Sequence, residues 1–446
     1  MTLPVRAFRV FASTQNPKPS QPIARLLLMA LFLAGLSQLS FAGTLAVGSC
    51  EQSYTSFLSI SAAVSAAPSV GSTTILVCPG IYPEQVQIIG KKITLKGVAF
   101  NGSNAAIIEP PSGGLLTNAT STFGGNIQAS VLVQNTTATI EDLTVDATGN
   151  GTVCGGDPIG IFYQNADGTI TRNNVIHVQV INGFGCQGGL GIYVESGATT
   201  IQPNPSPAAD ATVTITYNNV QDYDKNGITA NGTPTGITSN VNVTIGHNTV
   251  MGAGQVNDNA QNGIQLYGAN GSVTYNIVDG DWYTQATYAA AGILIIQSYS
   301  PVISYNTISN TNVGVYLDSL NPGDTDNATV KNNSITATHI FDAIVACANL
   351  SNITTNTVNF ADESGVNVAA CGDAAPTDTV TSNTINGACA GVLIAPPASA
   401  SPTGTYYNVA TQVSTTNTDS CTPALVKKQG GKKSVPAVSP GGAKKL

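Results

Sequence analysis

The chain has 446 residues, of which only 9% are charged, and a formal net charge of −8. The charge is uneven, because four of the 16 basic residues precede residue 43 and six lie after Val426, so the body between carries 24 acids against six bases, or −18. Such a body repels polyanions, which excludes nucleic acid as a partner. All eight cysteines lie in this body, as is typical of a protein that folds in an oxidising compartment.

Residues 1–42 have the organisation of a cleavable signal peptide. Basic residues precede an apolar stretch, Leu26 to Leu39, that is too short for an ordinary membrane span. Residues 40–42 (Ser-Phe-Ala) form a cleavage sequence, so the mature chain is expected to begin at Gly43. An uncleaved N-terminal anchor is the alternative. No later stretch is long and apolar enough to span a bilayer, and we expect a secreted, periplasmic or cell-surface protein.

Residues 43–98 are expected to form an N-terminal cap helix and a first coil. Apolar residues at helical spacing over residues 53–67 are stopped by Pro68 and Gly71. Two strands around a Pro-Gly turn and a third strand follow. The exposed apolar end of a stack of coils needs a cover, for which an amphipathic helix is suited. Glu84, within this segment, is expected to be an ordinary surface carboxylate.

One phrase recurs from about residue 170 to residue 394, and less regular copies fill residues 99–160. A short apolar strand leads into an asparagine, an apolar residue follows two positions later, and after a loop comes glycine with alternating apolar residues. The aligned asparagines are Asn173, Asn218, Asn248, Asn276, Asn306, Asn333, Asn356 and Asn383. The glycines are Gly160, Gly191, Gly227, Gly263, Gly292, Gly314, Gly365 and Gly391.

Repeats of this length are too short to fold alone and indicate a solenoid. The period of two and the β-branched residues predict strands, so the fold class is all-β. Two or three short strands per turn make a parallel β-helix, here of roughly eleven coils over residues 99–395. Equivalent strands then pair about 4.8 Å apart, and each asparagine stacks on the asparagine of the next coil.

These phrases resemble the parallel β-helix repeat of the right-handed, pectate-lyase-like (pectin lyase fold) superfamily, over roughly residues 50–395. The resemblance implies a right-handed coil whose activity, if any, lies on a parallel-strand face and its flanking loops. The superfamily includes polysaccharide lyases, hydrolases, esterases, epimerases and phage tailspikes. No catalytic residue carries over, because the repeat region has only Arg172, Lys225 and Lys331 as basic residues and lacks the hydrolase, esterase and epimerase motifs.

Three successive loops after the asparagine strands hold the candidate site. Their polar and aromatic residues, expected on one side of the coils, are Asp222, Asp224, Lys225, Asp258, Asp279, Asp281, Trp282 and Tyr283. Trp282, the only tryptophan, suits stacking on a sugar while carboxylates accept bonds from its hydroxyls. The carboxylates could instead bind calcium or act as a glycosidase acid and base. The alternative is a set of solvated turns.

Aromatic residues precede four successive asparagines: Tyr217, His247, Tyr275 and Tyr305. They are expected to stack between coils, with a carbohydrate platform as the alternative. His177 and His339 are expected to be isolated surface residues.

The eight cysteines allow up to four disulfides, and metal binding is the rival. The pairs that we favour are Cys50–Cys78, Cys154–Cys186, Cys347–Cys371 and Cys389–Cys421. Residues 396–446, rich in Lys, Pro and Gly, are expected to form a low-complexity, disordered tail.

The sequence therefore predicts a secreted β-helix that binds, and possibly cleaves, an extracellular polysaccharide. If the protein is an enzyme, a polysaccharide lyase or a glycoside hydrolase is expected. A non-enzymatic cell-surface or adhesion rod is the alternative. A further alternative is a calcium-dependent lyase, with Asp222, Asp224, Asp279 or Asp281 on the metal and Lys225 as base. Nothing in the sequence favours a particular oligomeric state.

Overall fold

The computed structural model describes residues 43–148, 156–179, 188–199, 204–235, 238–285, 288–320, 325–371 and 375–416. They all belong to the unit formed by residues 42–446. The predicted signal peptide, residues 1–42, lies outside the described residues. Within the described ranges, no helix is long and apolar enough to cross a membrane.

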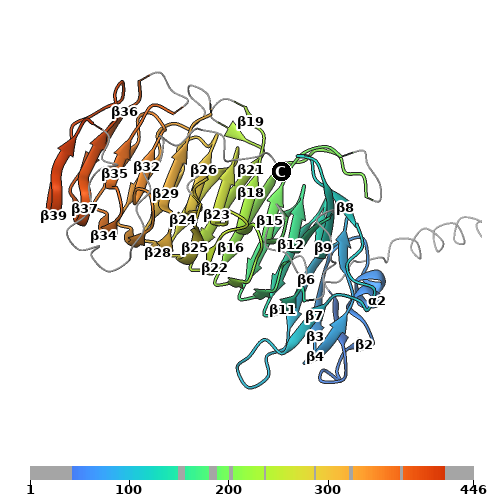
Figure 1. Cartoon of the computed structure of the whole chain (residues 1–446). Coiled ribbons are helices and arrows are strands. Elements are labelled where there is room, and N and C mark those ends of the chain that lie inside the picture. The colour runs from blue at the N-terminus through green and yellow to red at the C-terminus, as the bar shows by residue number, and fades with distance from the viewer. Residues whose placement is uncertain are drawn as a thin grey trace, which may run out of the picture. The chain divides into compact units, whose positions relative to one another are not determined.

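Short strands wind into a solenoid with three faces, which we call A, B and C (Figure 1). Face A is a 14-stranded sheet, and a 23-stranded sheet supplies faces B and C. Face A contains β2 (Thr55–Phe57), β1 (Gly43–Val47), β3 (Ser72–Val77), β6 (Lys92–Gly97), β10 (Thr137–Glu141), β13 (Asp167–Thr171), β16 (Ala211–Thr216), β21 (Val241–Gly246), β24 (Asn270–Thr274), β27 (Val302–Ser304), β30 (Thr329–Lys331), β33 (Asn352–Thr354), β36 (Thr377–Thr381) and β38 (Ser399–Ala400).

Face B follows face A in each coil, and face C follows face B. Face B contains β4 (Gly80–Pro83), β7 (Ala106–Glu109), β11 (Thr144–Asp146), β14 (Asn174–Ile176), β17 (Asn219–Gln221), β22 (Thr249–Val256), β25 (Ile277–Tyr283), β28 (Thr307–Thr311), β31 (Ser334–Thr338) and β34 (Thr357–Ala361). Face C contains β5 (Val86–Ile89), β9 (Asn126–Gln134), β12 (Asp157–Gln164), β15 (Leu190–Glu195), β18 (Asn226–Asn231), β23 (Asn262–Tyr267), β26 (Ala291–Ile296), β29 (Val313–Asp318), β32 (Ile344–Ala346) and β35 (Ser364–Val368). The long strands β37 (Asn383–Ile394) and β39 (Gly404–Ser414) run through both faces. Three further short strands are β8 (Ala119–Thr120), which pairs antiparallel with β9, and the hairpin β19 (Pro234–Thr235) and β20 (Thr238–Ser239).

Equivalent strands of successive coils pair in parallel and in register. Strands β16 and β21, for example, pair without a break from Ala211↔Val241 to Thr216↔Gly246. Alternate residues such as Ile215 and Ile245 point inward and are fully buried in one continuous core. This confirms the predicted all-β solenoid. Coils without the asparagine phrase, such as those of β3 and β6, precede the asparagine-bearing coils.

All eight aligned asparagines are buried and form one hydrogen-bonded ladder. Asn218 Oδ1 accepts from the backbone N–H and the Nδ2 of Asn173, both at 3.0 Å, and Asn218 Nδ2 donates to Asn248 Oδ1 at 3.0 Å. The same bonds repeat up to Asn383. Leu143 precedes the ladder, and its N–H donates to Asn173 Oδ1. The residue before each ladder asparagine has a positive φ, which turns the chain from face A to face B.

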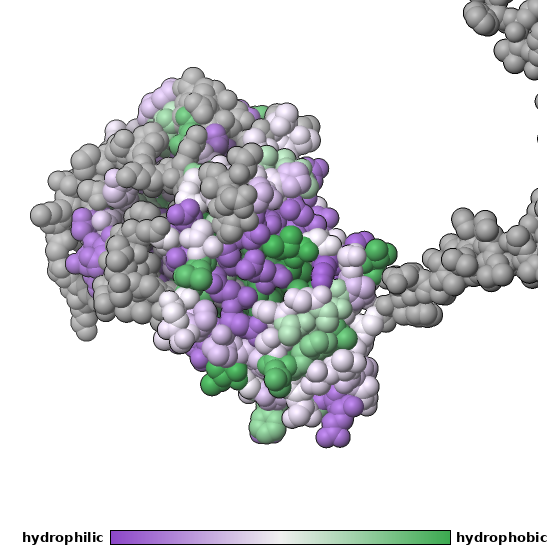
Figure 2. Space-filling view, turned by 90° about the vertical axis from the view of Figure 1, so that its right-hand side faces the viewer, coloured by the Kyte–Doolittle hydropathy of each residue, from purple (hydrophilic) through white to green (hydrophobic). Residues whose placement is uncertain are grey.

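Helix α2 (Ile60–Ala66) covers the N-terminal end of the core with Ile60, Ala63 and Val64. It is shorter than predicted, because residues 55–57 form β2 instead. Glu84 is not an ordinary surface residue, since its Oε1 accepts from the N–H of Ile60 and its Oε2 from that of Ser61, at 2.7 and 2.8 Å. This carboxylate thus neutralises the helix start. On the side shown in Figure 2, hydrophobic groups form separate patches among hydrophilic ones.

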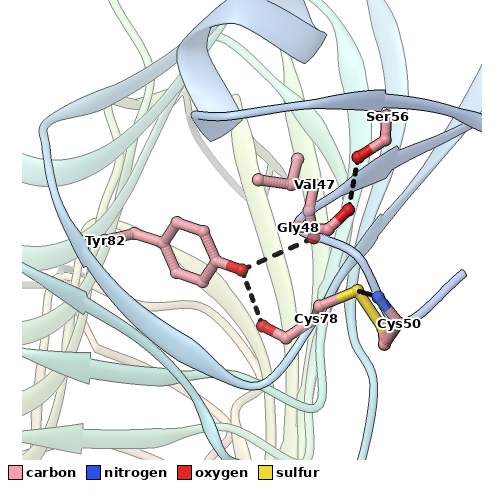
Figure 3. The surroundings of a disulfide bond; sticks show 6 residues. All are labelled: Val47, Gly48, Cys50, Ser56, Cys78 and Tyr82. Carbon is pink, nitrogen blue, oxygen red and sulfur yellow. Dashed lines mark hydrogen bonds between the residues drawn. A yellow bond between two sulfur atoms is a disulfide. The ribbon is translucent and has the colours of Figure 1, made fainter.

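The Cys50–Cys78 disulfide ties the first coil together, with Cα atoms 5.7 Å apart (Figure 3). Beside the disulfide, the Tyr82 hydroxyl donates to the carbonyl of Cys78 at 2.8 Å. This hydrogen bond is a second link between β4 and the residue that forms the disulfide. Ser56 Oγ donates to the carbonyl of Gly48.

A second disulfide joins Cys347 to Cys371, with Cα atoms 5.1 Å apart. Both pairs were predicted and are confirmed. Cys389 is also disulfide-bonded, and its predicted partner, Cys421, lies outside the described residues, as do Cys154 and Cys186.

The coils continue beyond the predicted boundary at Ala395. Strand β39 pairs with β37 from Asn383↔Gly404 to Leu393↔Ser414, so its backbone adds one more layer. The predicted tail therefore starts too early, because the polar composition of residues 396–416 conceals a strand. Residues 417–446 of the tail lie outside the described part of the chain.

Candidate functional site

The predicted loops lie at the corner between faces B and C. Two strands of face B, β22 and β25, run on past their neighbours into this corner. After a register shift they pair as Gly254↔Asp281, Gln255↔Trp282 and Val256↔Tyr283. We call this two-stranded extension, residues 254–256 and 281–283, the corner wall.

Gly280 separates the two acidic residues of β25. Its φ of +85° reverses the alternation of side chains, so Asp279 lies on the outer surface while Asp281 is 0% exposed. The hydroxyl of Tyr223 donates to Asp281 Oδ1 at 2.7 Å, and Oδ2 has no partner. Burial, helped by the nearby Asp279, raises the pKa of Asp281 well above its usual value. Burial of Asp281 therefore favours its neutral carboxylic acid form.

Asp279 forms a polar group with side chains of the next coil. Its Oδ1 accepts from Ser309 Oγ at 2.5 Å and from Asn310 Nδ2 at 2.8 Å. Within the described residues, no hydrogen bond engages Asp279 Oδ2, and the group is open to solvent.

Trp282 stacks on His339, with ring centroids 3.8 Å apart and an angle of 15° between the planes. The indole Nε1 and the imidazole Nε2 are buried without a hydrogen-bond partner. Burial lowers the pKa of His339, which favours the neutral ring. His339 is thus not the isolated residue that we expected. Tyr283, by contrast, is 7% exposed and belongs to the packing beneath the wall.

Asp222 lies on the same corner, two coils before Trp282, and is half exposed. Its Oδ2 is 3.7 Å from His177 Nε2, and His177 Nδ1 is 2.9 Å from Asp146 Oδ1. His177 therefore links carboxylates of two coils and is not isolated either.

The remaining predicted residues do not join Asp279 and Trp282. Asp224 is 0% exposed. Lys225 donates to the carbonyl of Ala260 at 2.7 Å, and burial lowers its pKa to about 8. Asp258 is exposed on the loop between β22 and β23. The eight predicted residues are thus divided between the interior and the surface.

Among the residues whose positions are described, no group of three or more His, Cys, Asp or Glu side chains could hold a metal ion. Asp281, one of the expected calcium ligands, faces the Tyr223 hydroxyl inside the coil, and its oxygens lie 2.8 Å from where a Cβ on Gly252 or Gly263 would stand. The arrangement offers no shared oxygen cage of the kind that calcium takes.

The aromatic residues before the asparagines form the expected stack. Ring centroids of Tyr217, His247, Tyr275 and Tyr305 are 4.8, 5.0 and 4.8 Å apart, with planes within 6° of parallel. Each inner ring is covered on both faces by its neighbours. Along its length the stack therefore presents ring edges, on which a sugar could not lie flat.

No protein-family model and no curated protein matches this sequence. Among solved structures, the lacto-N-biosidase of glycoside hydrolase family 136 from Eubacterium ramulus has a TM-score of 0.51 at 13% identity, covering 88% of this chain and 71% of that one. The catalytic unit of a family 87 α-1,3-glucanase from Streptomyces thermodiastaticus has a TM-score of 0.48 at 14% identity, covering 87% and 72%. A mannuronan C-5 epimerase module from Azotobacter vinelandii has a TM-score of 0.46 at 14% identity, covering 80% and 93%. The protein has the right-handed parallel β-helix fold. This is the pectate-lyase-like fold that the repeats predict.

Sequence reasoning missed three residues of this right-handed β-helix: Ser309, Asn310 and His339. The ladder asparagines contained the necessary signal. Asp279 and Ser309 each stand three residues after their asparagine, whereas Trp282 and His339 each stand six residues after theirs. Aligning every loop on its ladder asparagine would have placed these side chains together.

Proposed function

We propose that this right-handed β-helix binds a neutral extracellular polysaccharide at the corner between faces B and C. The observations that carry the proposal are the Trp282–His339 stack and the Asp279–Ser309–Asn310 group, because Trp282 and Asp279 stand three residues apart on the same strand, β25. Stacked rings give an apolar surface for the C–H groups of a sugar. Asp279 Oδ2 can accept hydrogen bonds from sugar hydroxyls, and Asn310 Oδ1 adds a second acceptor.

The fold and the disulfides support this class of ligand. The lacto-N-biosidase with the same fold acts on a carbohydrate, as its name states. Disulfides such as Cys50–Cys78 persist in oxidising compartments, where extracellular polysaccharides occur. The strongly acidic body disfavours anionic polymers, so the ligand that we propose is uncharged.

The geometry favours binding over cleavage. Hydrolysis of a glycosidic bond normally uses two carboxyl groups that face each other across the bond. Asp279 and Asp281 point to opposite sides of β25, and Asp281 is enclosed by Tyr223, Gly252 and Gly263. They cannot flank one substrate.

A panel of soluble neutral polysaccharides tests the proposal on the chain from residue 43 onward. Trp282 is the only tryptophan, so its fluorescence reports binding at the corner without a label. Reducing ends and the ultraviolet absorbance of unsaturated ends report cleavage. Fluorescence changes without products would support the proposal, whereas silence on every polymer would contradict it and favour a structural rod.

Two matched variants locate the site. Asp279→Ala should weaken binding about 10- to 100-fold, because hydrogen bonds to charged groups contribute roughly 1.5–3 kcal/mol. Asp210→Ala removes an exposed carboxylate just before β16 on face A, and its affinity should match the parent chain. Equal affinities for all three proteins would place the binding surface elsewhere.

A further inference from the structure

Face A carries a regular array of hydroxyl groups on its outer side. In five successive strands, β13, β16, β21, β24 and β27, two outward positions per strand are in register. Eight of these ten positions hold threonine or serine, and Gly246 and Val302 fill the other two. We call this array the hydroxyl grid. Its hydroxyl-bearing residues are Thr169, Thr171, Thr214, Thr216, Thr244, Ser272, Thr274 and Ser304. Thr171 and Ser304, at two corners of the grid, are buried, so six of the eight residues are accessible to a ligand.

None of the ten grid positions is charged, although Asp167 is exposed on β13 two residues before Thr169. Charges also mark the two ends of the grid. On the N-terminal side, Arg172 and Lys96 pair with Glu141 and Asp142. On the C-terminal side, Lys331 is in register with Ser304. In the coils of the grid, face B has a mixed surface, with Met251, Ile277 and Asp279 among its outward positions. One column of hydroxyl residues does occur further along face B, where Thr307, Ser334, Thr357, Thr384 and Thr405 are in register.

Strand propensity alone does not explain the grid. Threonine is common in strands, but so are valine, isoleucine and tyrosine. On face A, the aliphatic residues occupy the inward positions, such as Ile215 and Ile245, while the outward positions keep hydroxyls. The ten grid positions therefore have a mainly polar, uncharged character that packing of the core does not require.

The grid is preordered in two directions. Rows repeat about every 4.8 Å from coil to coil, and the two columns are about 6.6 Å apart along each strand. The β-branched threonines have restricted χ1 angles, so little side-chain entropy is lost on binding. Thr216 Oγ1 donates to Thr171 Oγ1 at 3.3 Å, which aligns hydroxyls of adjacent coils.

We propose that the hydroxyl grid binds the surface of an insoluble, ordered, neutral polysaccharide. A threonine offers a hydroxyl that both donates and accepts, and a methyl group that packs on C–H groups; a sugar surface offers the complementary set. A surface that repeats in two directions engages many sites at once only if its partner also repeats, as parallel polymer chains do. The proposal rests on the proposed function for the class of ligand, but it uses a face that the corner site does not.

Co-sedimentation tests this proposal, with microcrystalline cellulose, chitin and insoluble α-1,3-glucan as the solids. The double variant Thr214→Val and Thr244→Val removes two hydroxyls from the centre of the grid and keeps the β-branched shape. It should lower the partition coefficient on the bound solid about 10-fold, since two hydrogen bonds are lost. The matched control, Thr55→Val and Thr411→Val, makes the same change at exposed strand positions outside the grid and should bind like the parent chain.

The outcomes separate this inference from the corner site. The inference holds if the grid variant co-sediments less with the insoluble polysaccharide while its binding of soluble polysaccharide is unchanged. Trp282 fluorescence reports the soluble binding. Equal co-sedimentation of the grid and control variants overturns the inference. If only Asp279→Ala reduces co-sedimentation, the insoluble polysaccharide binds at the corner between faces B and C instead. If the protein binds soluble polysaccharide but co-sediments with none of the solids, the proposed role of the grid is refuted and the proposed function stands. Failure of both assays defeats both proposals.

Discussion

The asparagine ladder makes a quantitative prediction that two adjacent residues can test. Asn218→Ala removes four hydrogen bonds of 2.9–3.0 Å: two accepted from Asn173, and one donated to each of Ile170 and Asn248. The side chain is 2% exposed, so water cannot replace these partners. At a net value of roughly 1 kcal/mol for each bond, the free energy of unfolding should fall by about 4 kcal/mol.

The control is the same substitution one residue later. Asn219 points outward from face B and is half-buried, so Asn219→Ala should change the free energy of unfolding by no more than about 0.5 kcal/mol. Urea unfolding followed by far-ultraviolet circular dichroism measures both. Hydrogen exchange at β17 and its two neighbouring coils shows whether the loss is local, as expected of a one-dimensional array. If the two variants unfold within about 0.5 kcal/mol of each other, the ladder does not contribute as argued.

Three further predictions concern the corner and the aromatic stack. The raised pKa of Asp281 means that the folded state holds a proton that the unfolded state releases above about pH 4. The free energy of unfolding should therefore fall as the pH rises above about 4. Asp281→Asn should remove this decline, measured as the melting temperature between about pH 4 and pH 8. Because burial lowers the pKa of His339, protonation should quench Trp282 fluorescence with a midpoint below the ordinary histidine pKa of about 6.5. His339→Phe, which keeps a ring, should abolish the transition, and a midpoint above that pKa would contradict the buried geometry. Tyr275→Asn places a residue that tolerates the positive φ of this position and removes the ring. Loss of stacking should lower the free energy of unfolding, measured in urea, by about 1 kcal/mol. An unchanged free energy of unfolding would show that stacking of these exposed rings does not stabilise the fold.

Most of the fold could be predicted, because the same few residues recur in every coil. Ladder positions such as Asn248 and Asn306 gave the period, and the alternation around them gave the strands. The two ends were harder to predict. The strand at Gly404–Ser414 lacks an asparagine phrase, and its polar residues resemble a linker. Glu84 acts on a helix 23 residues earlier, and such a contact leaves no local pattern.

The candidate site was predicted only in part, for a local physical reason. Asp279 and Asp281 were expected in one loop on one side of the coils, where they could act together, but they lie in β25, whose side chains alternate between two faces. Gly280, with its positive φ, reverses the alternation between them and sends them to opposite sides, opposite a register shift in β22. A glycine inside a strand permits such a conformation but does not reveal it. His339 was missed because its partner, Trp282, lies two coils away.

The ladder also has a consequence for how such a chain can change its length. Ladder asparagines such as Asn218 and Asn248 form hydrogen bonds only with the coil before and the coil after, and these bonds are the same at each step. Cutting out residues 219–248 would bring Asn218 against Asn276 with the same donors and acceptors, and duplicating the segment would insert one more rung. The number of coils, and with it the length of the solenoid, can therefore change by whole repeats while the two ends and the N-terminal cap remain unchanged.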